Sequence, residues 1–462
     1  MEQNNQNNAR IVGLYTLGCK VAQYETEAIG EAFARRGFRV GDFDGACDVY
    51  VVNTCTVTAE SDRKSRQVIR RAARRNPGAV LMVTGCYSQR SPDEVARIPG
   101  VSVVIGTADK LSLVDLAQKL LAEKEERPAK APIAADVGGK DAAAPRALPL
   151  VRTTDVRRAA FEPMCITSVP RTRAYVKIED GCECRCTYCA ISDARGGVRS
   201  KPAADVIAEI EALYRAGTRE IVLTGIETGS YGRDFAEPFG LADLLSELNR
   251  RASCERVRLS SLSPELADAR FAEEVARLPI LAPHFHLSVQ SGSDAVLAAM
   301  RRRYTAAGAM ENIERLRRLI PSAMFTTDLM VGFPGETEED FLRTVDFVRR
   351  ARFLLCHVFV YSRRKGTVAD RMPDQIPEDE KRRRSERLMR VAREVRERLL
   401  DETVAAARPL SCVFETDRGG VWSGHSDSYI EVSVPSSENL HGEIRNVLPI
   451  RREGDVLVGK IV

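Results

Sequence analysis

Four cysteines crowd into the eight residues from Cys182 to Cys189, and three of them have the spacing C-x₃-C-x₂-C: Cys182, Cys186 and Cys189. A short loop with this spacing can wrap one inorganic core. Three thiolates leave one iron of a [4Fe–4S] cube free for a substrate, just as catalytic metal sites keep an open position. The spacing therefore favours an iron–sulfur cluster with an open iron. The alternative is a four-cysteine zinc or rubredoxin-like site that also uses Cys184.

Composition limits the class of protein. The 462 residues are 44% hydrophobic and 29% charged, with a formal charge of only +4, which is too mild to identify a nucleic-acid binder. No apolar run approaches the length that spans a bilayer, and the N-terminus has no apolar targeting segment. We expect a cytoplasmic monomer without a membrane partner. Cytosolic cysteines are normally reduced, so the twelve present favour metal binding or catalysis over disulfides.

The first part of the chain alternates short apolar runs with amphipathic ones. We expect strands over 11–15, 49–52, 80–83 and 101–105, and helices over 25–36, 61–75, 92–97 and 111–121. This alternation predicts an α/β domain with a parallel sheet and helices on its faces.

Three more cysteines follow successive strands of this predicted sheet: Cys19, Cys55 and Cys86. The carboxyl ends of parallel strands meet at one edge, where ligands bind. Glycines beside Cys19 and Cys86 allow the backbone to approach a bulky cofactor. A second three-cysteine cluster is therefore favoured over three buried thiols that serve only as small hydrophobes.

The helix after Cys55 carries seven basic residues against Glu60 and Asp62. A solvated face and contact with phosphate are equally good interpretations of this charge run. Beyond it, residues 122–170 are rich in Ala, Pro, Gly, Lys and Asp without a period, which is typical of a linker. We expect a first domain over 10–121, this linker, a second domain over 171–405 and a third over 406–462.

The second domain shows six strand–helix units, with strands expected over 174–178, 220–224, 256–260, 285–289, 324–331 and 355–360. This rhythm predicts a (βα)₆ partial TIM barrel, whose chemistry lies at the carboxyl ends of its strands. The cysteine loop and several small or polar residues fall at those ends: Thr224, Gly225, Ser260, Gln290, Gly332 and Glu336.

The C-terminal part differs in character. Residues 378–402 form a helix in which both charge signs nearly cancel, which favours an exposed, salt-bridged helix. The tail has short β-type runs between Gly and Ser turns, which predicts a small antiparallel β-barrel of a type often used on nucleic acid. Trp422 and Tyr429 could stack on bases, but filling the core of so small a domain is favoured.

The motifs resemble a known family. The loop of Cys182, Cys186 and Cys189 is similar to that of the radical S-adenosylmethionine superfamily. The segments at 16–25, 53–66 and 83–87 resemble the methylthiotransferases, and more narrowly the threonylcarbamoyladenosine tRNA methylthiotransferases. The resemblance extends through the segments at 220–225, 258–261, 290–293, 331–336 and 361–367.

This resemblance implies two [4Fe–4S] clusters, one on each cysteine set, and S-adenosylmethionine cleaved to a 5′-deoxyadenosyl radical. The clusters and the radical carry the chemistry, so no side-chain acid or base is expected. The implied product is a methylthio group at C2 of N6-threonylcarbamoyladenosine, at position 37 of tRNA. The C-terminal barrel would be a TRAM-like RNA-binding domain, and an external electron donor and a sulfur source are implied. The expected S-adenosylmethionine contacts are Thr224, Gly225, Ser260, Gln290, Gly332 and Glu336.

Other functions stay open on the sequence. Related methylthiotransferases act on isopentenyl-adenosine in tRNA or on a ribosomal protein side chain, and they share all six cysteines. A different class is a zinc-stabilised RNA-binding protein without catalysis.

Two positions depart from the family pattern. Ser428 stands where the family has Asn, so RNA contact by that turn is less expected. Cys184 is an extra cysteine within the loop, and we predict that it is not a ligand.

Overall fold

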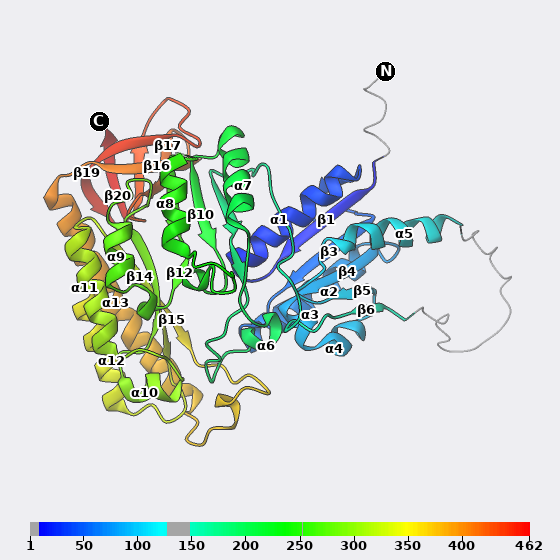
Figure 1. Ribbon diagram of the computed structural model, residues 1–462, viewed down its shortest axis with the longest axis horizontal. Coiled ribbons are helices and arrows are strands. Elements are labelled where there is room, and N and C mark those ends of the chain that lie inside the picture. The colour runs from blue at the N-terminus through cyan, green and yellow to red at the C-terminus, as the bar shows by residue number, and fades with distance from the viewer. Residues whose placement is uncertain (1–8, 127–147, 252) are drawn as a thin grey trace. The chain divides into compact units, whose positions relative to one another are not determined.

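The structure is a computed structural model that describes residues 9–126, 148–251 and 253–462 (Figure 1). The chain divides into two compact units, which are taken separately below. The first comprises Met1–Met164 and Asp193–Gly196, and the second comprises Cys165–Ser192 and Gly197–Val462. Within the described part, no helix combines the length and apolar character needed to cross a membrane.

The first unit is built on a six-stranded sheet in which every neighbouring pair is parallel, in the order β2-β1-β3-β4-β5-β6. Its strands are β1 (Ile11–Thr16), β2 (Arg39–Gly41), β3 (Val49–Thr54), β4 (Val80–Gly85), β5 (Val101–Ile105) and β6 (Leu150–Arg152). Strands β3 and β4 are buried along their whole length, as expected for strands covered on both faces. The predicted parallel α/β domain is confirmed.

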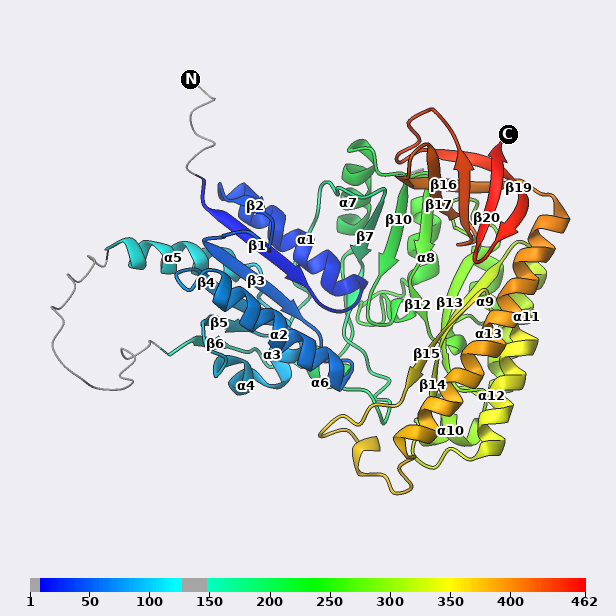
Figure 2. The ribbon, with the colours of Figure 1, turned by 180° about the vertical axis from the view of Figure 1, so that it is seen from behind.

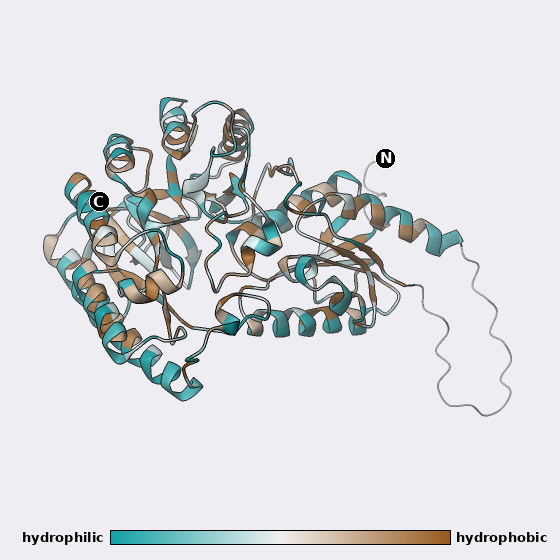
Figure 3. Cartoon of the chain, turned by 60° about the horizontal axis from the view of Figure 1, so that its bottom comes forward, coloured by the Kyte–Doolittle hydropathy of each residue, from teal (hydrophilic) through white to brown (hydrophobic). Residues whose placement is uncertain are grey.

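The helices of this unit are α1 (Lys20–Arg35), α2 (Ala59–Arg75), α3 (Cys86–Arg90), α4 (Pro92–Ala96) and α5 (Ser112–Glu126). Helix α2 shows why they form. Thr58 caps it by accepting from the Ser61 backbone N–H, its acidic residues lie in the first turn, and Arg74 and Arg75 lie in the last turn. Apolar residues on its inner side join the core beneath the sheet. In Figure 3, hydrophobic residues concentrate on the strands.

Strand β6 is the main difference from the sequence prediction in this unit. It lies within the stretch expected to be a linker, yet it adds a sixth strand beside β5. Later in the same stretch, the Tyr24 hydroxyl donates to the Met164 carbonyl at 2.7 Å. The linker residues 127–147 lie outside the described residues.

The second unit contains the predicted partial barrel, in two parallel sheets. One has the order β11-β10-β7 and the other the order β12-β13-β14-β15, and an isolated bridge between Val257 and Leu281 lies beside the break. The strands are β7 (Arg173–Lys177), β10 (Glu220–Thr224), β11 (Arg256–Leu259), β12 (Ser261–Leu262), β13 (His284–Gln290), β14 (Met324–Val331) and β15 (Leu355–Val360). A short antiparallel pair, β8 (Glu179–Asp180) and β9 (Arg199–Ser200), flanks the cysteine loop.

Helices separate these strands and cover the outside of the barrel (Figure 1). They are α7 (Ala203–Arg215), α8 (Leu241–Arg251), α9 (Ala269–Val275), α10 (Asp294–Ala299), α11 (Ala306–Leu319), α12 (Glu338–Ala351) and α13 (Glu378–Ala406). A further short helix, α6 (Ile191–Arg195), belongs to the first unit from Asp193 on.

Helix α13 is not the exposed helix that its balanced charges predicted. It runs beside β15 and α12 (Figure 2), and one side of it is buried, including Lys381, Arg384 and Leu388. Arg384 is paired with the buried Glu336 at 2.7 Å. A charge count over the helix could not reveal this, because the carboxylate that pairs with Arg384 lies on the barrel.

The C-terminal part is a closed five-stranded barrel in the order β16-β17-β18-β20-β19. Its strands are β16 (Leu410–Asp417), β17 (Val421–Ser426), β18 (Glu431–Pro435), β19 (Ile444–Glu453) and β20 (Val456–Ile461). Trp422 belongs to its core, as predicted. Tyr429 only borders that core: its ring stacks between His284 of β13 and His425, with centroid separations of 4.6 and 5.0 Å. The interpretation of Tyr429 as simple core filling is therefore incomplete.

Candidate functional site

The three cysteines of the first unit follow β1, β3 and β4, at the carboxyl edge of the sheet. In the strand order, β1 and β3 are the neighbours between which the direction of winding reverses, and ligands in such sheets bind outside this point. Cys19 follows β1 as the N-cap of α1, and Cys55 follows β3 directly. Cys86 begins α3 after β4. The sequence-predicted positions at a common edge are confirmed.

Two glycines at this edge, Gly18 and Gly85, lie where the chain is packed too tightly for a side chain. Gly18 has φ +123°, and a Cβ there would meet Cys55 Cβ at 3.1 Å. Gly85 has φ +103°, and a Cβ there would meet the Thr54 carbonyl oxygen at 2.4 Å. Glycine alone tolerates this combination of conformation and space, so both glycines serve to bring the strand ends, and with them the cysteines, together.

The thiols of this set influence one another electrostatically. Burial raises the pKa of Cys55 to about 11, and the Cys86 and Cys19 thiols also raise it. Burial raises the pKa of Cys86 as well, whereas the Arg195 guanidinium lowers it. Cys55 and Cys86 are buried, whereas Cys19 is exposed. Two buried thiolates this close together are costly without cationic charge. Metal ions bound to the sulfurs supply that charge, so this donor set suits a metal cluster.

In the second unit, each sulfur of the C-x₃-C-x₂-C loop accepts a hydrogen bond from an N–H group. Cys182 Sγ accepts from the Cys184 backbone at 3.5 Å, and Cys189 Sγ accepts from the Ile191 backbone at 3.3 Å. Cys186 Sγ accepts from Arg302 Nη1 at 3.4 Å. N–H donors aimed at ligand sulfurs are a known means of tuning iron–sulfur clusters.

The spacing of both cysteine sets suits a core larger than one ion. Sulfurs around a single tetrahedral zinc at about 2.3 Å lie roughly 3.8 Å apart. Over residues 9–126, 148–251 and 253–462, the group of three or more candidate ligands whose atoms all lie within 4.8 Å of one another is His286, Asp328 and His357. As their side chains lie in this structure, the cysteine sets are therefore not arranged around a single zinc ion.

Two buried carboxylates beside the loop were missed from the sequence. Glu179 accepts from the Glu227 backbone N–H at 2.5 Å, and Glu227 accepts from the Ser263 backbone N–H at 3.0 Å. Burial raises the pKa of Glu227 to about 8 and raises that of Glu179 well above its ordinary value. Both residues follow barrel strands β7 and β10, so the rule that chemistry gathers at strand ends could have found them.

Gly225 makes room for one of these carboxylates. A Cβ at this position would meet Glu179 Oε1 at 2.1 Å. The sequence predicted that Gly225 contacts S-adenosylmethionine. The structure shows that a glycine is also needed at this position because Glu179 packs against it.

Arg302 is the main cation of this site, and it too was missed. Besides Cys186, it donates to the Ser288 carbonyl at 2.8 Å and to Ser263 Oγ at 3.1 Å. Its Nε donates to the Tyr304 hydroxyl, which donates in turn to the Val289 carbonyl at 2.7 Å. The guanidinium thus ties the cysteine loop to the end of β13.

The expected S-adenosylmethionine contacts lie at the carboxyl ends of β10, β11, β13 and β14. Thr224 Oγ1 and Glu336 Oε1 are buried and have no hydrogen-bond partner among the described residues. A ligand rich in amino and hydroxyl groups would satisfy such atoms, so the rim fits S-adenosylmethionine. Gln290 has φ +66°, an uncommon conformation for a residue with a side chain.

Part of this rim is also structural. Glu336 Oε2 accepts from the Gly332 backbone N–H at 2.6 Å and from Arg384 at 2.7 Å. A Cβ on Gly332 would meet Lys381 Cγ at 2.3 Å. Both residues therefore also hold the loop after β14 against α13.

The barrel strands carry a histidine–aspartate pair as well. His286 Nε2 lies 3.3 Å from Asp328 Oδ2, and its Nδ1 lies 2.8 Å from Thr326 Oγ1. His284 contacts the same hydroxyl at 3.0 Å. The alternating positions put both histidines on one face of β13, as predicted.

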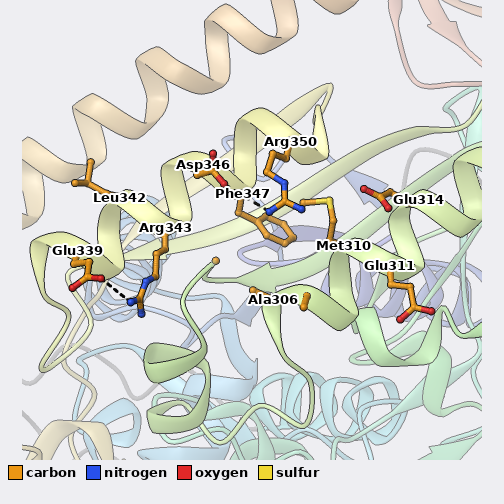
Figure 4. Close-up of a pocket in the computed structure, with 12 residues that line it drawn as sticks. Ala306, Met310, Glu311, Glu314, Glu339, Leu342, Arg343, Asp346, Phe347 and Arg350 are labelled. Atoms are coloured by element: carbon orange, nitrogen blue, oxygen red, sulfur yellow. Dashed lines mark hydrogen bonds and ion pairs between the residues drawn. The ribbon is translucent and has the colours of Figure 1, made fainter.

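The cavity drawn in Figure 4 is separate from these residues. Its lining comes mostly from α11 and α12, with Met310, Phe347 and Arg350 among the lining residues, and its volume is about 620 Å³. Arg343 in its wall is paired with Glu339 at 2.7 Å. No cysteine contributes to it, so the candidate chemistry lies elsewhere.

Comparison with known proteins agrees with this geometry. Residues 176–348 match the Radical SAM superfamily, and residues 12–106 match the uncharacterized protein family UPF0004. Among solved structures, the radical S-adenosylmethionine methyltransferase TsrM from Kitasatospora setae is similar in fold, with a TM-score of 0.53 and 18% identity, over 90% of this chain and 77% of that one.

Curated relatives match nearly the whole chain. A threonylcarbamoyladenosine tRNA methylthiotransferase of Bacillus subtilis is 40% identical, over 94% of this chain and 93% of its own length. One of Thermotoga maritima is 36% identical, over 91% of each chain. A tRNA-2-methylthio-N(6)-dimethylallyladenosine synthase of Syntrophomonas wolfei is 31% identical, over 94% and 97%. The chain is therefore an enzyme that belongs to the radical S-adenosylmethionine tRNA methylthiotransferase family.

Proposed function

We propose that this enzyme inserts a methylthio group at C2 of N6-threonylcarbamoyladenosine at position 37 of tRNA. The observation that carries the reaction type is the presence of two separate three-cysteine sets, each at a carboxyl edge of its own parallel strands. The substrate is supported by the relatives: those named for threonylcarbamoyladenosine are 34–40% identical, whereas those named for dimethylallyladenosine are 31–34% identical.

The radical SAM superfamily uses S-adenosylmethionine and a [4Fe–4S] cluster, and we assign the cluster ligands to Cys182, Cys186 and Cys189. Bound there, these groups supply a radical that abstracts hydrogen from an unactivated C–H bond, which no side-chain base can deprotonate. Arg302 and two backbone N–H groups hold the ligand sulfurs. The rim from Thr224 to Glu336 orients S-adenosylmethionine, and Glu179 and Glu227 line the buried side of the loop.

We assign a second [4Fe–4S] cluster to Cys19, Cys55 and Cys86, where it would carry the sulfur that is transferred. The tight backbone at Gly18 and Gly85 and the mutual effect of the thiols support this assignment. The reaction then needs an external electron donor and a sulfur source. The first unit up to residue 121, the partial barrel over 171–405 and the small barrel over 406–462 are the proposed functional domains.

Binding of tRNA is proposed on two surfaces. On α2, Lys64, Arg70 and Arg74 are exposed and have no ion-pair partner among the described residues, whereas Arg66 and Arg75 pair with acidic residues. Unpaired exposed cations on one helix suit a phosphate backbone. The second surface is the C-terminal barrel. With tRNA as the substrate, we propose a cytoplasmic location.

The turn before Tyr429 has a structural use within the second unit. Ser428 is buried, and the Ser426 and Asp427 carbonyls accept hydrogen bonds from Arg258 at 3.1 and 2.8 Å. This turn anchors the small barrel to β11.

Nucleoside analysis of tRNA from a strain that lacks this gene tests the substrate. The expected result is accumulated N6-threonylcarbamoyladenosine without its methylthio group, restored by the parent gene and not by a Cys182→Ala variant. Loss of a methylthiolated isopentenyl-adenosine instead would reassign the substrate. An unchanged tRNA with an altered ribosomal protein would point to the protein-modifying relatives, and zinc without labile sulfide in the purified protein would contradict enzyme chemistry altogether.

A further inference from the structure

Three charged side chains are completely buried inside the first unit, behind Cys86. Glu25 of α1 and Lys110 are 0% exposed, and Arg195 is 1% exposed. Glu25 accepts from Arg195 Nη1 at 2.9 Å and from Nη2 at 3.2 Å, and Lys110 Nζ lies 2.5 Å from Glu25 Oε2. Burial of three charges is costly unless each has a specific partner.

The Nε donor of Arg195 is directed at a proposed cluster ligand. Its Nε donates to Cys86 Sγ at 3.3 Å. Glu25 accepts hydrogen bonds from both Nη1 and Nη2 of Arg195 in a bidentate pair. Because this pair fixes the orientation of the planar guanidinium, Nε remains directed at the Cys86 sulfur. The contact is therefore built into the fold of this unit.

The end of helix α6, which supplies Arg195, is also held in place. The Ala194 carbonyl accepts from Thr107 Oγ1 at 2.6 Å. Gly196 has φ +76°, and a Cβ there would meet the Val156 carbonyl oxygen at 2.3 Å. Arg195 thus belongs to the first unit, although it lies only six residues after Cys189 in the sequence.

The charges of this group suit a cluster. Arg195 and Lys110 are cations on either side of the Glu25 carboxylate, and Arg195 lies against the Cys86 sulfur. A [4Fe–4S] core in its 2+ state with three thiolates would carry one negative charge, and its reduction would add another. A cation buried beside a ligand sulfur stabilises such negative charge.

We propose that Arg195 is a positioning residue that holds the Cys86 sulfur and raises the reduction potential of the cluster on Cys19, Cys55 and Cys86, with Glu25 and Lys110 setting its charge. This inference rests on the proposed second cluster. Reduction adds a negative charge, which a nearby cation and an N–H donor to sulfur both stabilise. Because Arg195 follows the other cysteine loop so closely, one short segment serves both proposed cofactors.

The test is a redox titration of the full chain carrying Cys182, Cys186 and Cys189 all changed to Ala, so that only the second cluster remains. In this background we expect Arg195→Met and Lys110→Met to lower the midpoint potential and Glu25→Gln to raise it. For Arg195→Met, the expected change is at least tenfold in the reduction equilibrium, or 59 mV for one electron. Arg195→Lys, which keeps the charge, should lie between Arg195→Met and the parent background.

Opposite signs for cation and anion removal cannot arise from a purely structural role. Arg173→Lys is the matched control, since Arg173 is a partly buried cation of the second unit paired with Glu415 at 2.6 Å, and it should leave the potential unchanged. If iron is retained but the potentials of all variants agree, the assignment of Arg195 is wrong while the second cluster stands. If the background protein folds without any iron, the second cluster itself is contradicted, and this inference with it.

Discussion

At the scale of single residues, the hydrogen bonds that three of the cysteine sulfurs accept are the main feature of the cysteine loop. Three sulfurs accept N–H donors, and the fourth cysteine, Cys184, contributes its backbone N–H to Cys182. The Cys184 and Cys182 thiols also interact, and only this second contact depends on the Cys184 side chain. This distinction makes the role of Cys184 testable by side-chain removal.

We expect Cys184→Ala to keep cleavage of S-adenosylmethionine, measured as 5′-deoxyadenosine formed after chemical reduction. The backbone N–H remains, but the half-buried thiol and its contact with the Cys182 thiol are lost, so the substitution should cost about 0.5–1.5 kcal/mol. Cys182→Ala is the control and should abolish cleavage. Loss of cleavage in Cys184→Ala would indicate a fourth thiolate ligand.

Gly225 provides a second test at this scale. We expect Gly225→Ala to force Glu179 aside and to destabilise the protein by about 1–3 kcal/mol, as overpacking of a tight site does. Denaturant unfolding measures this change. Gly308→Ala is the control because its added Cβ would lie 3.4 Å from Thr305 Oγ1 inside helix α11 and should cost little. Equal stability of the two variants would contradict the close packing around Glu179.

At the scale of elements, one ion network holds the C-terminal barrel to the radical SAM barrel. Glu220 of β10 accepts from Arg258 at 2.7 Å and from Arg256 at 3.1 Å. Arg256 also donates to Ser411 Oγ of β16 at 2.6 Å. The carboxylate thus organises cations that reach across to the small barrel.

This network predicts acid sensitivity. Burial raises the pKa of Glu220, but Arg258, Arg256 and Arg173 outweigh burial and lower the pKa to about 2, from an ordinary value of 4.5. A depressed pKa stabilises the folded state above pH 4.5, and this stabilisation is lost as the pH falls toward 2. Glu220→Gln should cost about 3–5 kcal/mol at pH 7, because it leaves buried cations unpaired.

Thermal unfolding at several pH values measures both effects. The stability difference between the parent and Glu220→Gln should shrink as the pH falls below 4.5. Glu247→Gln is the control, since Glu247 pairs with Arg250 on the exterior of α8. A constant difference across the pH range would show that Glu220 does not titrate as described.

The exposed cations of helix α2 are predicted to bind tRNA phosphates. Changing Lys64, Arg70 and Arg74 together to Gln should weaken tRNA binding for every sequence and reduce the slope of log K against log salt by about one per lost phosphate contact. Filter binding at several salt concentrations measures the slope. The paired Arg63, which contacts Glu60 at 2.5 Å, offers a control in Arg63→Gln. An unchanged slope in the triple variant would remove α2 from the RNA surface.

The sequence predicted long periodic elements well because burial on two faces leaves a clear apolar pattern, as in β3 and β4. It missed β6, because that strand has three exposed residues and its place depends on pairing with β5. Glu179, Glu227 and Arg302 were missed for a related reason: their importance comes from partners distant in sequence.

At the scale of the whole molecule, we propose that one reaction is divided between two cysteine sets in two separate units. Both sets together predict roughly eight irons per chain, about four for each intact site. Removal of either set should halve the iron content without unfolding the protein. Iron and sulfide analysis under anaerobic conditions provides this count.

The most direct test compares two triple variants of the reconstituted enzyme, given S-adenosylmethionine, a reductant and tRNA that carries N6-threonylcarbamoyladenosine. With Cys19, Cys55 and Cys86 changed to Ala, the account predicts continued formation of 5′-deoxyadenosine but no methylthiolated nucleoside. With Cys182, Cys186 and Cys189 changed to Ala, it predicts neither product. Methylthiolated nucleoside formed by the first variant, measured by mass spectrometry, would contradict the division of the reaction between the two sets.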